Sequence, residues 1–231
     1  YVGGVCGRSS GTITNCYNEG AVTGTGGVGG NDDYYTSVGG VCGWSSGTIE
    51  NCCSTGIVSG DEVGGVCGYN YNGTITNCYW LNSVLVGIGG SNDESPATNV
   101  KSKTNDQFAS GEVAWLLNKG QTNGPWRQNL SGDADTSPVL DIMHKEVVKL
   151  TVDDTVRYLN KGDSFTSENG KVYYDSNNER VENTFTVYED TSLTSKLLVT
   201  VTADDKTAFV GDAMPALTYT FAGFEEGETF T

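Results

Sequence analysis

Small apolar residues and glycine alternate in the first third of the chain, in a pattern that occurs three times. Each copy begins with Val-Gly-Gly-Val-Cys-Gly and continues, after a short polar stretch, into Gly-Thr-Ile-x-Asn-Cys; the copies begin at Val2, Val38 and Val63. Apolar positions separated by single polar or glycine positions have the period of a strand with one buried face. Glycine at the corners permits backbone angles that other residues avoid. We therefore predict three short strands in each copy.

A single copy is too small to bury its apolar face, so the copies are expected to stack on one another as a short parallel β-solenoid. The copies start 36 and then 25 residues apart, and the first contains an insertion at 32–35 that is expected to bulge from a corner. The chain as a whole is predicted to be mainly β. The residues expected to be buried in matching columns are Val5, Ile13, Val41, Ile49, Val66 and Ile75.

The repeated pattern VGGVCGxSSGTIxNCYxxGxV resembles the GLUG motif, a short glycine-rich repeat of bacterial surface proteins, over residues 1–80. Such repeats are associated with large exported adhesin-like proteins and with non-catalytic regions of bacterial surface proteases. The resemblance supplies no catalytic residues. It implies a location outside the cell, at the cell surface or cell wall, with any export signal or anchor outside residues 1–231.

All seven cysteines lie in the repeats. Cys6, Cys42 and Cys67 share one repeat position and Cys16, Cys52 and Cys78 another, so stacking should form two inward ladders at the strand spacing of about 4.8 Å. Buried reduced thiols are the favoured state. One or more disulfides, and a metal site despite the absence of a Cys-x2-Cys pair, remain alternatives. Cys53 follows Cys52 directly, so it should point the opposite way and is predicted to be the most exposed thiol.

A change of period marks the segment after the repeats. The sequence is polar and irregular from Ser91 to Asn99, and Thr104-Asn-Asp-Gln then fits a capping box at the start of a helix that ends near Gly120. Trp115 and Trp126 are expected to cover the open end of the last coil, with binding of a sugar ring as the alternative. The segment 99–141 is similar to the region that closes GLUG arrays.

Alternating apolar positions return between Val148 and Val201 and predict a small antiparallel β module over 142–202. Residues 173–196 resemble the Listeria–Bacteroides repeat, a β-grasp-like module of surface proteins, and an immunoglobulin-like sandwich is the alternative. Residues 201–224 resemble the opening of an MBG domain, and 203–231 is interpreted as its truncated start. The predicted organisation is therefore a solenoid at 1–98, a helical cap at 99–141, and β modules at 142–202 and 203–231.

The charge of the chain limits the classes of molecule that it is expected to bind. The formal net charge is −16, with 13 cations against 29 acidic residues and no basic cluster in the sequence. Nucleic acids and anionic membranes need clustered Lys or Arg, so neither is an expected partner. No apolar run approaches the roughly 18 residues that span a bilayer, so membrane insertion is not expected.

Catalytic chemistry has little support in the sequence. The only histidine, His144, is interpreted as a linker residue, which leaves no obvious base for a Ser-His-Asp or Cys-His hydrolase. Carboxylate pairs occur at Asp32-Asp33 and Asp61-Glu62, but neighbours in a strand point apart. We expect no enzyme activity and no cofactor, with Ca²⁺ at the acidic loops as an alternative.

The sequence thus predicts a non-catalytic fragment of an exported bacterial surface protein. It would act as a rigid spacer and adhesion platform for host glycans or extracellular matrix proteins. The alternative is an accessory region of a large surface protease or carbohydrate-active enzyme. The candidate ligand-facing residues are Trp44, Tyr34, Tyr35, Tyr69 and Trp80.

Overall fold

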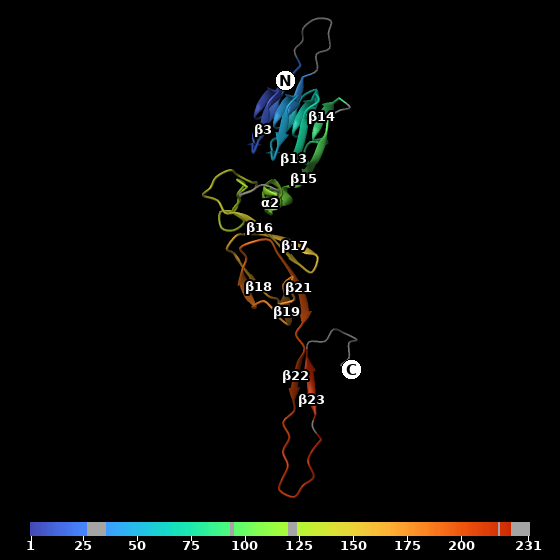
Figure 1. Cartoon of the computed structure of the whole chain (residues 1–231), viewed down its shortest axis with the longest axis vertical. Coiled ribbons are helices and arrows are strands. Elements are labelled where there is room, and N and C mark those ends of the chain that lie inside the picture. The colour runs from blue at the N-terminus through green and yellow to red at the C-terminus, as the bar shows by residue number, and fades with distance from the viewer. Residues whose placement is uncertain (27–35, 93–94, 120–123, 217, 223–231) are drawn as a thin grey trace. The chain divides into compact units, whose positions relative to one another are not determined.

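The computed structural model describes residues 1–26, 36–92, 95–119, 124–216 and 218–222 (Figure 1). The chain divides into two compact units. The repeat unit comprises residues 1–148 and 158–161, and the C-terminal unit comprises residues 149–157 and 162–231. The regular secondary structure of the described residues is mainly β-strand, with little helix. The mainly β class and the parallel solenoid are therefore confirmed.

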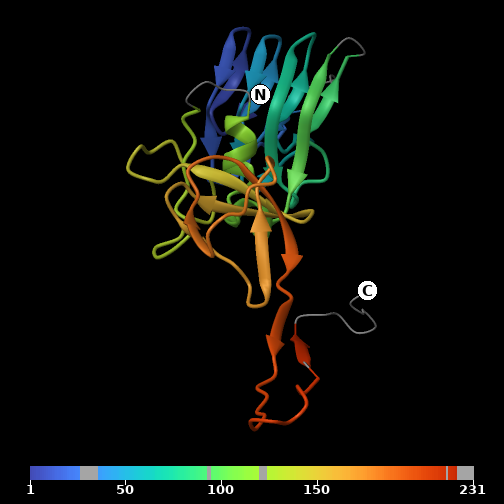
Figure 2. The same ribbon diagram turned by 60° about the horizontal axis from the view of Figure 1, so that its bottom comes forward.

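Each side of the solenoid is a parallel sheet whose strands come from successive coils. One sheet contains β1 (Val2–Gly3), β6 (Ser37–Gly39) and β11 (Glu62–Gly64). The next contains β2 (Cys6–Ser9), β7 (Cys42–Ser45), β12 (Cys67–Asn70) and β14 (Ile88–Ser91). The largest contains β3 (Thr12–Thr14), β4 (Tyr17–Asn18), β8 (Thr48–Glu50), β9 (Cys53–Ser54), β13 (Thr74–Leu81) and β15 (Ala97–Lys103), while β5 (Val22–Thr23) and β10 (Val58–Ser59) form a pair. Figure 2 shows these strands side by side in chain order, from blue to green.

The coils stack in the register that the repeats predict. Ile13 pairs with Ile49, and Ile49 pairs with Ile75, so one residue type forms a continuous column. These isoleucines and Val41 and Val66 are buried, as expected. Val5 was expected to be buried as well and is 43% exposed. It lies in the first coil of the described residues, which pairs with the second coil.

The stack continues past the third copy of the motif. Strand β14 pairs with β12, and β15 pairs with β13 as far as the contact of Leu81 with Lys103. Pro96 lies inside this fourth coil, where its carbonyl oxygen accepts a hydrogen bond from the backbone N–H of Ile75 at 3.1 Å. The polar composition of 91–99 therefore conceals a coil that follows the same backbone path without the repeat sequence.

Asparagine occupies the same tight corner in all four coils. Asn15, Asn51, Asn77 and Asn99 have φ between 48° and 55°. Asparagine adopts this left-handed conformation more readily than most residues with a side chain. The Asn77 amide also donates a hydrogen bond to Asn51 Oδ1 at 2.7 Å. The Asn-Cys pair of the motif therefore sets a corner and links one coil to the next.

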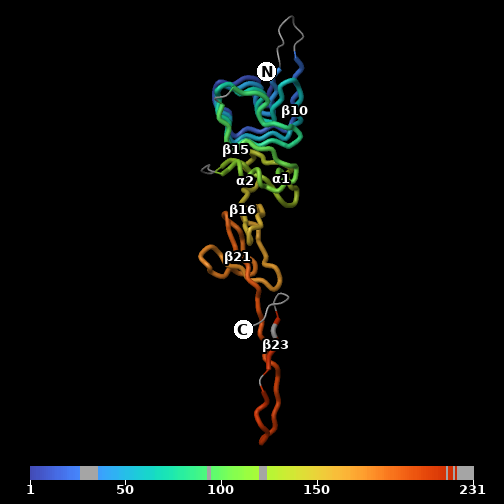
Figure 3. The backbone as a smooth tube through the Cα atoms, turned by 90° about the vertical axis from the view of Figure 1, so that its right-hand side faces the viewer, coloured from blue at the N-terminus to red at the C-terminus, as the bar shows by residue number. Residues whose placement is uncertain are grey.

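A helical segment follows the last coil. It comprises α1 (Asn105–Ala109) and α2 (Glu112–Asn118), and both hydrogen bonds of the predicted capping box at Thr104 and Gln107 are present. In Figure 3 the successive coils overlie one another, and α1 and α2 run along one side of them. Their apolar residues Phe108 and Leu117 pack with Cys53 and Tyr79 of that side. The segment thus covers a lateral face of the stack, which corrects the expectation of a cap on its end.

The chain from Val147 onward forms a sheet with the order β17-β16-β21-β19 and two separate strand pairs, β18 with β20 and β22 with β23. The strands are β16 (Val147–Val152), β17 (Thr155–Asn160), β18 (Ser164–Thr166), β19 (Lys171–Tyr174), β20 (Thr184–Thr186), β21 (Thr191–Leu197), β22 (Thr200–Ala203) and β23 (Tyr219–Ala222). Strand β16 pairs with β21 in parallel, and β21 pairs with β19 in antiparallel fashion. An immunoglobulin-like sandwich has antiparallel sheets, so the parallel pair favours the β-grasp-like alternative.

Candidate functional site: an aromatic row and two buried networks

A row of large side chains crosses three coils on the sheet of β2, β7 and β12. Arg8, Trp44 and Tyr69 occupy equivalent positions in the register, and we call these residues together with Tyr1 and Tyr71 the aromatic row. The Arg8 guanidinium lies 4.4 Å from the centre of the Trp44 ring. The rings of Trp44 and Tyr71 stack with centroids 5.8 Å apart and planes 19° from parallel. The in-register stack therefore aligns cation–π and ring contacts across neighbouring coils.

Exposure within the row is uneven. Trp44 and Tyr69 are half-buried, whereas Tyr1 is 59% and Tyr71 49% exposed. Arg8 and Tyr71 cover Trp44, and the Tyr1 ring lies 5.9 Å from it. A ligand would therefore meet mainly Tyr1 and Tyr71, two residues that the sequence pattern did not single out because neither lies in the repeated motif.

The other predicted ligand-facing aromatic residues do not join this row. Trp80 is only 7% exposed, packs in the solenoid core, and donates its indole N–H to the Val84 carbonyl oxygen at 2.9 Å. The expectation that Trp80 faces a ligand is therefore wrong, because its ring packs among the core residues. Tyr34 and Tyr35 lie outside the described residues.

The two later tryptophans serve packing of the repeat unit. Trp126 is fully buried, donates its indole N–H to Asn15 Oδ1 at 3.2 Å, and has its ring 6.1 Å from that of Tyr17. Trp115 is half-buried, with its ring centre 5.9 Å from that of Tyr158. Trp126 reaches the first coil, at the opposite end of the stack from the coil it was expected to cover.

All seven cysteines are free thiols. Cys6, Cys42 and Cys67 are paired in register, and the last two are fully buried, as the ladder interpretation predicted. A hydrogen bond to Cys78 and burial raise the pKa of Cys52, and burial is the main cause of the raised pKa of Cys53. High pKa values keep these thiols protonated and unreactive at neutral pH.

Cys53 corrects the prediction of an exposed thiol. Its side chain lies on the opposite side of the strand from Cys52, as alternation requires, but it is only 2% exposed. Phe108, Leu117 and Trp126 cover that side of the sheet. Alternation thus correctly separates the two thiols, and burial of the second depends on a segment more than 50 residues away.

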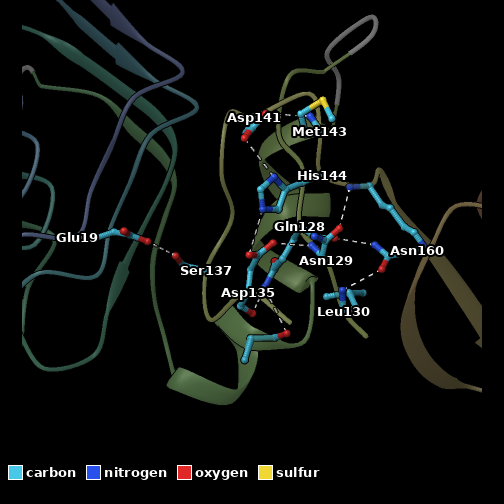
Figure 4. Close-up of polar contacts among 12 residues, drawn as sticks. Glu19, Gln128, Asn129, Leu130, Asp135, Ser137, Asp141, Met143, His144 and Asn160 are labelled. Carbon is cyan, nitrogen blue, oxygen red and sulfur yellow. Dashed lines mark hydrogen bonds and ion pairs between the residues drawn. The ribbon is translucent and has the colours of Figure 1, made fainter. Parts of the chain in front are cut away.

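His144 lies between two carboxylates in the loop that follows the helical segment (Figure 4). Its Nε2 is 3.4 Å from Asp135 Oδ1, and its Nδ1 is 3.6 Å from Asp141 Oδ2. The other oxygen of Asp135 accepts a hydrogen bond from the backbone N–H of Asn129 at 2.7 Å. These contacts hold one loop closed.

Gln128 and Asn160 form a second polar network, also visible in Figure 4. Both side chains are fully buried. Gln128 donates to the Phe108 carbonyl oxygen at 2.8 Å, and Asn160 donates to the Gln128 carbonyl oxygen at 2.6 Å. Asn160 also accepts from the backbone N–H of Leu130 at 2.9 Å. The network satisfies backbone groups that would otherwise be buried without partners.

The acidic pair Asp61-Glu62, one of the two considered for catalysis or Ca²⁺, accepts hydrogen bonds from Thr36 and Ser37. Glu62 accepts a hydrogen bond from the Ser37 hydroxyl at 2.7 Å, and Asp61 accepts a weak one from the backbone N–H of Thr36 at 3.4 Å. Asp32 and Asp33 lie outside the described residues. Among the residues that the structure describes, no group of three or more His, Cys, Asp or Glu side chains is arranged to hold a metal ion.

Comparison with known families identifies both ends of the chain. The model of the GLUG motif matches residues 1–23 and 60–84, and the model of the MBG domain (YGX type) matches residues 199–231. Both resemblances are thereby confirmed, and both domains are typical of bacterial surface proteins. No curated protein and no solved structure matched the chain. No helix in the described ranges is long and apolar enough to cross a membrane.

Proposed function

We propose that this chain is a non-catalytic part of an extracellular bacterial surface protein, in which the repeat unit acts as a rigid spacer and as an adhesion platform. The expected partners are host glycans or extracellular matrix proteins. The main support is the alignment of aromatic side chains across adjacent coils, because a stack of identical backbone paths presents its surface residues at a fixed spacing.

Support for the spacer role comes from the backbone register. Every coil contributes strands to continuous parallel sheets, and the coil-to-coil contacts include columns of Val, Ile and Cys that are fully buried in the second and third coils. Bending such a stack would break hydrogen bonds along one side of the coils. The close packing of these columns opposes that deformation.

Support for the adhesive role comes from Tyr1 and Tyr71. Both rings are about half exposed, and Arg8 adds hydrogen-bond donors over Trp44, the ring that both tyrosines contact. A partly exposed aromatic surface with a polar edge is typical of recognition surfaces, because the rings offer contact area with little loss of conformational entropy.

The test is an array of host glycans, mucins and matrix proteins probed with the full 231-residue chain. We expect binding to at least one ligand class, and we expect the double variant Tyr1→Ala, Tyr71→Ala to lose at least tenfold in affinity. Tyr188→Ala is the matched control, because Tyr188 is 65% exposed and lies in the C-terminal unit. Absence of binding, or equal binding by the double variant, would remove the adhesive role of the aromatic row and leave the spacer role.

A further inference from the structure

A pocket in the repeat unit gathers positive charge in a chain that is otherwise strongly acidic. The pocket has a volume of about 530 Å³ and lies between β15 and α2. Among the described residues, its lining includes Lys101, Lys103 and Lys119, with Glu112 as the one acidic residue. Three lysines and one glutamate give a local charge of +2, whereas the whole chain carries −16. Lys119 lies in a different element from Lys101 and Lys103, so the sequence does not show the three lysines as one cluster.

The floor of the pocket is the corner of the coils. Asn51, Asn77 and Asn99 follow one another along the stack, and all three line the pocket. Asn77 is held firmly: its amide donates to Asn51 Oδ1 at 2.7 Å and to the Leu116 carbonyl oxygen at 3.1 Å. The Tyr79 hydroxyl donates to Asn77 Oδ1 at 2.7 Å, and burial raises the pKa of Tyr79 to about 12, so this bond persists at neutral pH. The floor is therefore preorganised.

Two of the three lysines are available to a ligand. Lys103 forms an ion pair with Glu112, which offsets its charge. Lys101 lies opposite Tyr79 in the register, and Lys119 directly follows α2 with its ammonium 5.5 Å from the centre of the Trp115 ring. Within the described ranges, neither Lys101 nor Lys119 has an ion pair with a carboxylate, and the Asn99 side chain makes no hydrogen bond.

We propose that this pocket binds an acidic sugar, meaning a pyranose that carries one carboxylate. The ammonium groups of Lys101 and Lys119 pair with the carboxylate, and the amides of Asn51 and Asn99 match ring hydroxyls, since an amide both donates and accepts hydrogen bonds. Leu116 adds an apolar surface for the ring. The volume lies in the range of about 300–1,000 Å³ that is typical of small-molecule sites.

The surrounding charge sets the size of the ligand. A polyanion such as nucleic acid would extend beyond the pocket into a surface whose net charge repels it. A ligand with a single carboxylate places its charge beside the lysines alone. An inorganic anion would use the lysines and leave the asparagine amides unmatched. This site is separate from the aromatic row, and its binding does not depend on adhesion by that row.

The experiment is a titration of the full chain, followed by NMR, with D-glucuronic acid and with N-acetylneuraminic acid. We expect at least one of them to bind with a dissociation constant of about 1 mM or tighter, and D-glucose to bind at least tenfold more weakly. Lys101→Gln and Lys119→Gln should each weaken binding at least threefold, and the double variant should weaken it at least tenfold. Lys206→Gln is the matched control, because it removes the same charge from an exposed residue of the C-terminal unit.

Several results would overturn the proposal. These are failure of both acidic sugars to bind, equal binding of D-glucose, binding of inorganic phosphate as tight as that of the better sugar, or unchanged affinity of the double lysine variant. Thermal unfolding of each variant checks that it is folded. The double variant Tyr1→Ala, Tyr71→Ala should bind the acidic sugar as the unaltered chain does, which separates this site from the aromatic row.

Discussion

In the repeat unit, the core-facing Ile and Cys of the motif in the second coil have a residue of the same type above and below them. Ile49 lies between Ile13 and Ile75, and all three are buried. In the C-terminal unit, a buried side chain meets different partners instead: the Phe165 ring lies 5.5 Å from Tyr173 and 5.6 Å from Phe185. The core of the repeat unit therefore depends on how many copies are stacked, whereas the core of the C-terminal unit depends on contacts between particular side chains.

The difference extends to the surfaces of the two units. The end of the C-terminal unit leaves large apolar side chains open to solvent, with Phe209 at 85% and Met214 at 86% exposure. In the repeat unit, the change from burial to exposure occurs between equivalent residues of different coils, as Val5 and Val41 demonstrate. In a solenoid, the effect of a substitution should therefore depend on its coil as well as on its residue type.

The largest expected effect is that of a charge in a middle column. Ile49→Asp should lower the free energy of unfolding of the repeat unit by more than about 4 kcal/mol, because an ionised carboxylate would enter an apolar core without a partner. Ile57→Asp is the matched control, since Ile57 is 67% exposed, and should change stability by less than about 1 kcal/mol. Denaturant unfolding measures both. Similar values for the two variants would contradict the proposed burial of the column.

A smaller effect on stability is expected from alanine substitutions at Gly11 and Gly47, which occupy the same position in two copies of the repeat. A Cβ at Gly47 would lie 1.9 Å from the Gly11 carbonyl oxygen of the previous coil, whereas a Cβ at Gly11 would meet no atom within 4 Å. Gly47→Ala should therefore cost about 2 to 3 kcal/mol, and Gly11→Ala should change stability by less than about 1 kcal/mol. Thermal unfolding compares them. Equal losses would show that conformation, and not the distance between coils, requires glycine at this corner.

The smallest effect concerns the buried thiols and is specific to the repeat unit, which contains every cysteine. The raised pKa values of Cys52 and Cys53 mean that the folded state keeps protons that the unfolded state releases above about pH 8.5. Their contribution to stability is complete below that pH and is lost as pH rises. We expect a loss of about 1.5 kcal/mol for each such thiol between pH 8.5 and pH 10.

Denaturant unfolding at several pH values measures this slope. Cys53→Ala is the control, because it should reduce the dependence of the unfolding free energy on pH by the contribution of one thiol. Alkylation at pH 8 gives an independent measure: the half-buried Cys6 and Cys16 should react before Cys53. Rapid labelling of Cys53 in the folded protein would contradict its coverage by the helical segment.

The sequence alone determined the repeats, their parallel stacking, the two cysteine ladders and the capping box. The motif shared by the three copies predicts matching backbone paths, so the pairing of Ile49 with Ile75 could be expected from the sequence. The capping box at Thr104 is equally local, because its two hydrogen bonds join residues three apart. The sequence could not reveal the fourth coil, because Ala97–Lys103 follows the backbone path without carrying the motif.

Only the tertiary structure decided which outward faces meet water and which groups form a site. Cys53 points away from the core, as alternation predicts, and is buried because the helical segment covers it. Lys101 and Lys119 line one pocket because β15 and α2 lie on the same side of the coil. Periodicity specifies the direction of a side chain relative to its own strand, but exposure and local charge depend on segments that are distant in sequence and close in space.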